Sequence, residues 1–189
     1  MFNLRFKLGG IILLILGNLI FSSQLFGKSF IWEIREREKI SYLIGSVHML
    51  DKTFYPLNRA YEESFKHSDS LVVEVDISGA NAAKLSMLMM ELSQYTENDG
   101  LKNNISEETY RMTEAKLKAL DLDIKQFHNR KPWFVALNIA ATEMLKRGFD
   151  PEFGIDRYFL KKANSKEIIE LEGARFQLEM FNGFSKVEQ

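Results

Sequence analysis

The sequence predicts an α/β fold built on a β-α-β core, and two observations support this prediction. Two short apolar runs, 42–47 and 71–75, have the length and composition of β-strands, and each places one chemically competent polar side chain at or near its end. Apolar residues at helical spacing occupy the segment between the runs and most of the chain after them. We therefore expect a mixed sheet, with several helices inserted after the second core strand.

The first half of the domain contains the predicted β-α-β unit. The charged segment 35–38 separates two apolar runs, a pattern typical of a β-hairpin, and Pro56 can begin the crossover helix. His48 then follows the first core strand, and Glu74 lies within the second. The elements expected here are a strand over 30–34, a strand over 39–44, a helix from Pro56 to 67–69 and a strand over 71–75.

The second half is predicted to be mainly helical. Ser106 can cap one helix, and Pro132 can begin another, which Gly148 and Pro151 end. One more apolar run is expected to add a third strand to the sheet. The elements expected here are helices over 85–92 and 106–120, a helix from Pro132 to Gly148, a short helix over 155–163, a strand over 166–171 and a helix over 173–184.

Composition narrows the possible classes of protein. The 189 residues are 46% hydrophobic, enough for one ordinary core. The 25 basic and 26 acidic side chains nearly cancel and form no basic stripe, so we expect no nucleic-acid partner. Because the chain has no cysteine, it can form neither disulfides nor a lipid-modified cysteine.

The first 27 residues have the pattern of an export signal. Arg5 and Lys7 precede the apolar stretch 8–21, and Ser22-Ser23-Gln24 follows it. The stretch is shorter than the roughly 20 residues that a membrane-spanning helix needs. We expect residues 1–27 to be a cleaved signal peptide, with 28–189 as the exported domain in the periplasm or outside the cell. If the signal is not cleaved, it is a membrane anchor, and it is the only membrane contact expected.

His48 is the first candidate site residue. A neutral imidazole can bind a transition metal, or it can act as a general base near neutral pH. Gly45 is expected to let the backbone bend so that the ring faces a cleft. A structural or solvent-facing histidine remains the alternative.

Glu74 is the second candidate. A carboxylate in the middle of the run 71–75 would be buried on a sheet face, where an unpaired charge is costly. Such a group needs a metal ion, a cation or a proton. The alternative is an edge strand with Glu74 and Asp76 on its solvated face.

Asp156 and Glu172 are further candidates for the same cleft, because both lie next to predicted element ends. Each also has a structural interpretation: Asp156 can cap the helix after it, and Glu172 suits the positive end of a helix dipole. The remaining histidines, His67 and His128, are expected to be solvated.

Taken together, these segments resemble the TraB/GumN family, which includes the TIKI-type peptidases. The resemblance runs from about residue 30 to the end of the chain and depends on the order of its pieces. The matching pieces are 42–48, 54–57, 69–76, Lys131-Pro132-Trp133, Gly154-Ile155-Asp156 and Leu171-Glu172 with Gln177.

The resemblance implies an α/β, TIKI-like fold and metal-dependent hydrolysis that uses two Gly-x-x-His motifs and a glutamate. His48 matches the histidine of the first motif, and Glu74 matches the glutamate. No second Gly-x-x-His occurs in this sequence. We therefore expect the chain to be the N-terminal portion of a longer protein, with the C-terminal part of the fold missing.

Two functions follow from this resemblance. The first is an exported hydrolase that acts on a peptide or amide bond, in which His48 and Glu74 bind a divalent ion (Mn, Co or Zn) and Glu74 activates water. The substrate would be a peptide or a small molecule. The second is a non-catalytic binding or accessory protein of the envelope with the same fold, or an inactive truncated form.

Overall fold

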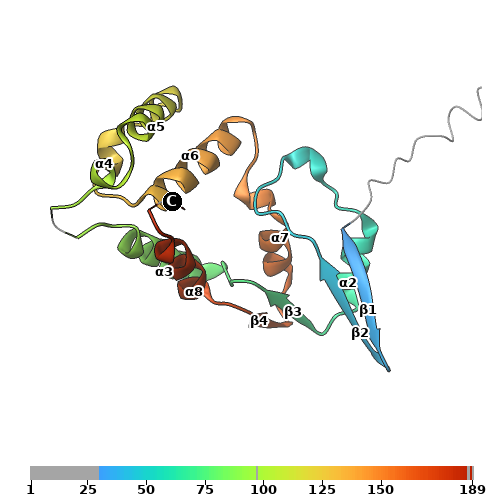
Figure 1. Cartoon of the computed structure of the whole chain (residues 1–189). Helices are drawn as coiled ribbons and strands as arrows, with labels where there is room; N and C mark the ends of the chain where they lie inside the picture. The colour runs from blue at the N-terminus through green and yellow to red at the C-terminus, as the bar shows by residue number, and fades with distance from the viewer. Residues whose placement is uncertain (1–29, 97, 187, 189) are drawn as a thin grey trace, which may run out of the picture.

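The computed structural model describes residues 30–189 apart from 97, 187 and 189, and it confirms the α/β class (Figure 1). The predicted signal segment 1–27 lies outside the described residues. No helix in the described part of the chain is long and apolar enough to cross a membrane. The elements are β1 (Ile31–Glu36), β2 (Lys39–Ile44), η1 (Lys52–Phe54), α2 (Arg59–Lys66), β3 (Ser70–Val73), α3 (Gly79–Leu92), α4 (Leu101–Asn104), α5 (Glu107–Ala119), η2 (Ile124–Phe127), α6 (Pro132–Lys146), η3 (Pro151–Phe153), α7 (Ile155–Lys162), β4 (Glu167–Glu170) and α8 (Ala174–Gly183).

The strands form two separate pairs among the described residues. β1 and β2 pair antiparallel, and β3 and β4 pair parallel. The helices α3 to α7 lie between β3 and β4 in the chain. The expectation of one mixed sheet, in which β2 and β3 belong to one β-α-β unit, is therefore wrong for these residues. The helix α2 does connect β2 to β3, but no hydrogen bond joins the two strands.

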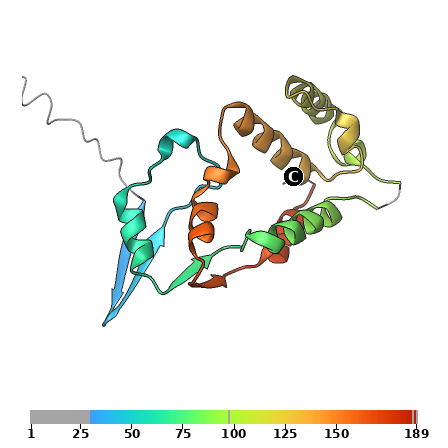
Figure 2. The same cartoon turned by 180° about the vertical axis from the view of Figure 1, so that it is seen from behind.

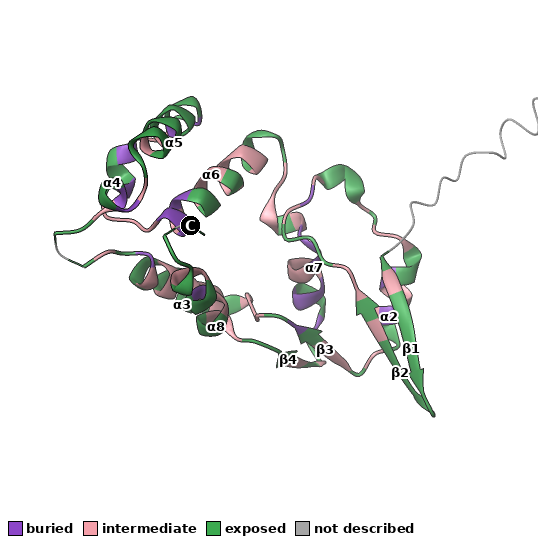
Figure 3. Ribbon diagram, in the orientation of Figure 1, coloured by how far each residue is buried: buried purple, intermediate pink, exposed green. Residues whose placement is uncertain are grey.

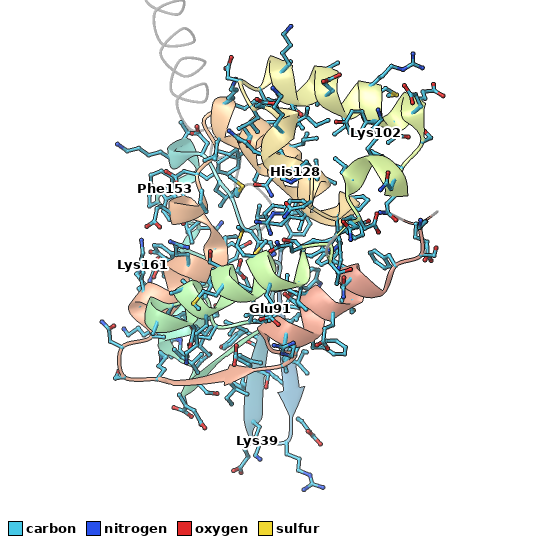
Figure 4. The ribbon with its side chains drawn as sticks, turned by 90° about the vertical axis from the view of Figure 1, so that its left-hand side faces the viewer. Lys39, Glu91, Lys102, His128, Phe153 and Lys161 are labelled. Atoms are coloured by element: carbon cyan, nitrogen blue, oxygen red, sulfur yellow. The ribbon has the colours of Figure 1, made fainter. Side chains whose placement is uncertain are left out.

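The hairpin is largely exposed. Glu36 pairs with Lys39, so a two-residue turn closes the hairpin, and Arg37 in that turn has a φ of 55°. Figure 4 shows the hairpin projecting beyond the helices, with Lys39 at its tip. One face is partly apolar, since Trp32 and Leu43, which pair across the two strands, are 54% and 58% exposed.

The strand that leads to Glu74 is shorter than predicted. β3 ends at Val73, opposite the last residue of β4, Glu170. Glu74 therefore lies just after the strand and is exposed. The expectation of a carboxylate buried in the middle of a strand is wrong, since Glu74 follows the last residue of β3 and its side chain is exposed.

The crossover helix α2 begins three residues after the predicted start at Pro56. Its N-cap is Asn58, whose side chain accepts a hydrogen bond from the amide of Ala60. An asparagine at this position satisfies one of the free amides of the first turn, which a proline cannot do. The helix ends at Lys66, with His67 as its C-cap, just before the predicted end at 67–69.

The helices α4 to α6 share one apolar core cluster. The predicted starts of two helices are confirmed: Ser106 caps α5 and accepts a hydrogen bond from the amide of Thr109, and Pro132 is the first residue of α6. Leu117 and Leu101 are almost fully buried in this cluster. The buried members are Leu101, Leu117, Ile124, Phe127 and Val135.

A lysine holds the C-terminal helix in place. The Nζ atom of Lys131 donates to the carbonyl of Leu92 at 2.8 Å and to Oδ1 of Asn182 at 2.5 Å, which links the end of α3 to α8. The rings of Trp133 and Phe181 stack beside this link, 5.9 Å apart. Figures 1 and 2 show α3 and α8 side by side, with α8 in front in Figure 1 and α3 in front in Figure 2.

A second apolar cluster lies beneath the strands, and it is this cluster that positions the candidate site. Residues of α2 and α7 form its centre, and Ile44 of β2 and Leu71 of β3 both pack against it. The buried residues of α7 in Figure 3 mark this position. Its buried members are Leu50, Tyr61, Ile155 and Phe159.

Candidate functional site

The loop that carries His48 is held on both sides by the segment that leads into α7. The amide of Ile155 donates to the carbonyl of Val47 at 2.9 Å. Leu50 and Asp150 form an antiparallel bridge, with N···O distances of 3.3 and 2.9 Å. His48 lies between these contacts, so its backbone position is fixed by a segment about 100 residues later in the chain.

Two glycines allow the close approaches on which this loop depends. A Cβ atom on Gly154 would lie 2.3 Å from the carbonyl oxygen of His48, so only a glycine lets these two segments of the chain touch there. A Cβ atom on Gly45 would lie 2.9 Å from Cβ of Phe30. Gly45 thus makes room for Phe30, the residue before β1, and its predicted role as a bend stays a prediction.

His48 and Ser46 both bind the carboxylate of Asp156. Nδ1 of His48 lies 2.6 Å from Oδ2, and Oγ of Ser46 lies 2.5 Å from Oδ1. Asp156 lies in the first turn of α7. The N-cap of this helix is Gly154, and no side chain caps the helix. Asp156 therefore does not serve as the cap that one interpretation predicted; its carboxylate is directed to the His48 loop.

The charges of this pair shift both pKa values. The hydrogen bond to Asp156 raises the pKa of His48 above its ordinary value of 6.5, against the opposing effect of partial burial; the negative charges of Asp156 and Glu74 add to the rise. Burial by itself would raise the pKa of Asp156. The hydrogen bonds from His48 and Ser46 outweigh it and leave the pKa below 3.8. Near neutral pH the aspartate is thus ionised and holds the ring by an Nδ1–H donor.

This arrangement is not that of a serine nucleophile. In a Ser-His-Asp triad the histidine lies between the serine and the aspartate and takes the proton of the hydroxyl. Here Asp156 lies between Ser46 and His48. Ser46 therefore acts as a second donor that orients the carboxylate.

A second polar cluster surrounds Glu74. Nε2 of Gln177 donates to Oε2 of Glu74 at 3.1 Å and to Oε2 of Glu172 at 3.0 Å. The backbone amides of Glu172 and Gly173 donate to the carbonyl of Glu74, at 3.2 and 3.4 Å. The turn between β4 and α8 thus brings two carboxylates onto one amide.

Residues of both clusters line one groove. The groove has a volume of about 460 Å³ and runs between β2 and β3, with Ser46, Glu74 and Asp156 among its lining residues. His48 itself does not line it, but it contacts the groove through Asp156. We call this feature the β2–β3 groove; its other lining residues are 40–44, 64–65, 67–73, Ile155, Phe159 and Leu171.

The structure pairs the four predicted site residues two by two. It joins His48 to Asp156 by a direct hydrogen bond, and it joins Glu74 to Glu172 through Gln177. Sequence reasoning gave no role to Ser46, and nothing in its local pattern indicates a partner in α7. Gln177 was only a matching position in the family resemblance, and the structure shows that its side chain contacts Glu74 and Glu172.

The other two histidines lie outside both clusters. The rings of His67 and His128 are exposed, and each Nδ1 lies within 2.9 Å of a carbonyl oxygen of its own helical turn. His67 lines the β2–β3 groove. Among the described residues, no group of three histidine, aspartate or glutamate side chains is arranged to hold a metal ion.

Comparison with known proteins gives one family and two curated relatives. A sequence model of the TraB/PrgY/gumN family matches residues 30–189. The uncharacterized protein YbaP of Shigella flexneri is 31% identical over 142 residues, 74% of this chain and 51% of the relative. YbaP of Escherichia coli K12 is 30% identical over 141 residues, 74% of this chain and 50% of the relative. The chain thus spans about half the length of the curated relatives it matches. No solved structure matches it at a significant level.

Proposed function

The chain belongs to the TraB/PrgY/gumN family, and from this premise we propose that it supplies part of the site of a metal-dependent hydrolase acting on a peptide or amide bond. The observation that supports this proposal is the contact between His48 and Asp156. A histidine that binds a metal through one ring nitrogen usually donates the other N–H to a carboxylate or a carbonyl. Nδ1 of His48 makes that contact, which leaves Nε2 as the nitrogen for the metal.

The donor atoms suit the ion only in part. Imidazole nitrogen and carboxylate oxygen are ligands for manganese, cobalt and zinc, and His48 and Glu74 offer one of each. A catalytic site typically has about three protein ligands, more than the described residues bring together. The remaining ligands would come from the portion of the relatives that this match does not cover, as the family resemblance implies with its second Gly-x-x-His.

The protein side chains then have separate tasks. A bound divalent ion would lower the pKa of a water molecule and provide a nucleophile near neutral pH. In the neutral ring, Asp156 keeps the proton of His48 on Nδ1, so that Nε2 carries the lone pair that a metal would bind. Gln177 occupies Oε2 of Glu74, which leaves Oε1 as the oxygen that can accept a proton from the attacking water.

Metal titration of the purified chain tests this proposal. We expect weak binding of Mn²⁺, Co²⁺ or Zn²⁺ that His48→Ala abolishes and Glu74→Gln weakens, with His67→Ala as the matched control that changes nothing. In full-length E. coli YbaP, alanine at the position aligned with His48 should abolish both metal binding and hydrolysis of peptides. Metal binding that survives His48→Ala would contradict the proposal.

A non-catalytic binding protein of the envelope is the second candidate. It is favoured by the incomplete set of metal ligands among the described residues. The two candidates differ in one result: full-length YbaP that binds metal through the aligned histidine, yet hydrolyses no peptide or amide, would be the binding protein.

We also propose that the protein is exported. The proposal rests on the basic start and the apolar stretch 8–21, together with the lack of cysteine. Cell fractionation should find a shortened chain in the periplasm or the medium, or an uncut chain in the inner membrane if the stretch is an anchor. Intact chain in the cytosol would contradict export.

A further inference from the structure

The β2–β3 groove lies between two open strand edges. It is lined by five consecutive residues of β2 and by all four residues of β3, but by no residue of β1 or β4. A sheet face would contribute only every second residue, because side chains alternate along a strand. Consecutive residues from both strands show that the groove follows the two backbone edges that face away from β1 and β4.

The pairing registers identify the backbone groups along these edges. The amide of Gly45 donates to the carbonyl of Phe30, so in β2 every second residue before Gly45 bonds to β1 and the alternate residues point away. The carbonyl of Val73 accepts from Leu171, so Val72 points away from β4. The outward residues, whose backbone groups form no hydrogen bond with another described residue, are Ile40, Tyr42, Ile44, Ser70 and Val72.

The groove also has an apolar floor. Phe65 of α2 and Ile155 and Phe159 of α7 line it, and the rings of Phe65 and Phe159 lie 4.9 Å apart. Because Ile44 and Leu71 pack against the same cluster, both strands rest on one helical layer. Figure 1 shows α7 above β3 and α2 beside the hairpin. The pairs β1–β2 and β3–β4 thus lie on the same helices, and each has an unpaired strand edge towards the groove. Such an arrangement forms a site for one more strand.

We propose that the β2–β3 groove receives a β-strand, and that this strand comes from the half of a full-length family member outside the matched residues. The curated relatives are about twice as long as the matched segment. The strand would present apolar side chains to Phe65 and Phe159 and would end beside Glu74 and Asp156. It would join the two strand pairs into one sheet. This inference does not depend on metal binding or hydrolysis.

Hydrogen–deuterium exchange tests the proposal directly. In this chain the outward amides of β2 and β3 should exchange within seconds. In full-length E. coli YbaP, the amides aligned with Tyr42 and Val72 should exchange at least about 100-fold more slowly, because strand pairing protects them. Fast exchange in the full-length relative would overturn the proposal. So would fast exchange that slows only when an extended peptide is added, since the groove would then be a substrate site.

A proline substitution provides a second, independent test. Because the amide of Tyr42 points away from β1, Tyr42→Pro should leave the hairpin of this chain as stable as the matched control Tyr42→Val. Proline at the aligned position of full-length YbaP should lower Tm by about 5 °C or more relative to valine, since it removes a ladder hydrogen bond. Equal Tm values for proline and valine in YbaP would overturn the proposal. Unfolding of this chain by Tyr42→Pro alone would show that the edge is already paired.

Discussion

Gly154 lies directly against the backbone of His48, so closely that a Cβ atom at position 154 would come within 2.3 Å of the His48 carbonyl oxygen. The amide of the next residue, Ile155, bonds to Val47, and Asp156 binds the His48 ring. The close approach of these two segments is thus what allows a carboxylate from α7 to reach a histidine 108 positions earlier.

Gly154→Ala should therefore separate the His48 loop from α7. We expect the free energy of unfolding to fall by about 1 to 3 kcal/mol, the usual cost of forcing extra atoms into a packed contact. Urea unfolding measures this change. The matched control is Gly183→Ala in α8, where the new methyl group meets nothing within 4 Å. It should be neutral or stabilise by up to about 1 kcal/mol. Equal stability of the two variants would contradict the packing argument.

Asp156→Asn should lower the pKa of His48. The hydrogen bond and the negative charge of Asp156 both raise this pKa, and an amide supplies no charge. NMR titration of the ring protons would show the midpoint of His48 moving down towards 6.5. Asp123→Asn, which removes the same charge beside the other core cluster, should leave the midpoint of His48 unchanged. A midpoint unaffected by Asp156→Asn would mean that the contact does not form in solution.

The same pair makes stability depend on pH. Because the pKa of folded His48 is raised, its contribution is complete below 6.5 and is lost as the pH rises through the folded value. Because the pKa of folded Asp156 is lowered, its contribution is present above 3.8 and is lost as the pH falls through the folded value. The side chain of His48 is 74% exposed, so solvent screening limits the whole effect to about 1 kcal/mol or less.

Urea unfolding of the wild type and of Asp156→Asn checks this window. The difference between them should be largest between about pH 4 and pH 6.5 and should shrink at about pH 9, where His48 is neutral in both the folded and the unfolded state. A difference that stays constant from acid to alkaline pH would show that the hydrogen bond contributes without the charge.

Lys131→Met should loosen α8. Burial lowers the pKa of Lys131, and its two hydrogen bonds hold the end of α3 against Asn182. Loss of hydrogen bonds to a charged group typically costs about 1.5 to 3 kcal/mol, and we expect a loss in that range by urea unfolding. The exposed Lys125→Met is the control and should change stability by less than about 0.5 kcal/mol. Exchange of the α8 amides should also become faster, which a purely global effect would not confine to that helix.

The sequence by itself determined most of the longer elements, although α3 begins at Gly79 rather than at the predicted residue 85 and the short helix α4 was not predicted. Apolar spacing and turn residues are local, so they predict the hairpin, α5 to α8 and β4 to within a few residues, and they single out His48 and Asp156 as polar groups at element ends. Where a local rule competed with a better local partner, the prediction was wrong: α2 begins after Asn58 and not at Pro56, because the Asn58 side chain can accept a hydrogen bond from a free amide of the first turn.

The tertiary structure alone decided which elements pair and which side chains meet. The length of β3 depends on where its partner β4 ends, 97 residues after Val73, so the sequence around Glu74 could not show that this carboxylate is exposed. The contacts of His48 with Asp156 and of Glu74 with Gln177 join segments about 100 residues apart. No local pattern encodes such a contact, because it depends on the packing of α7 and α8 against the strands. That packing also leaves the edges of β2 and β3 open towards one groove.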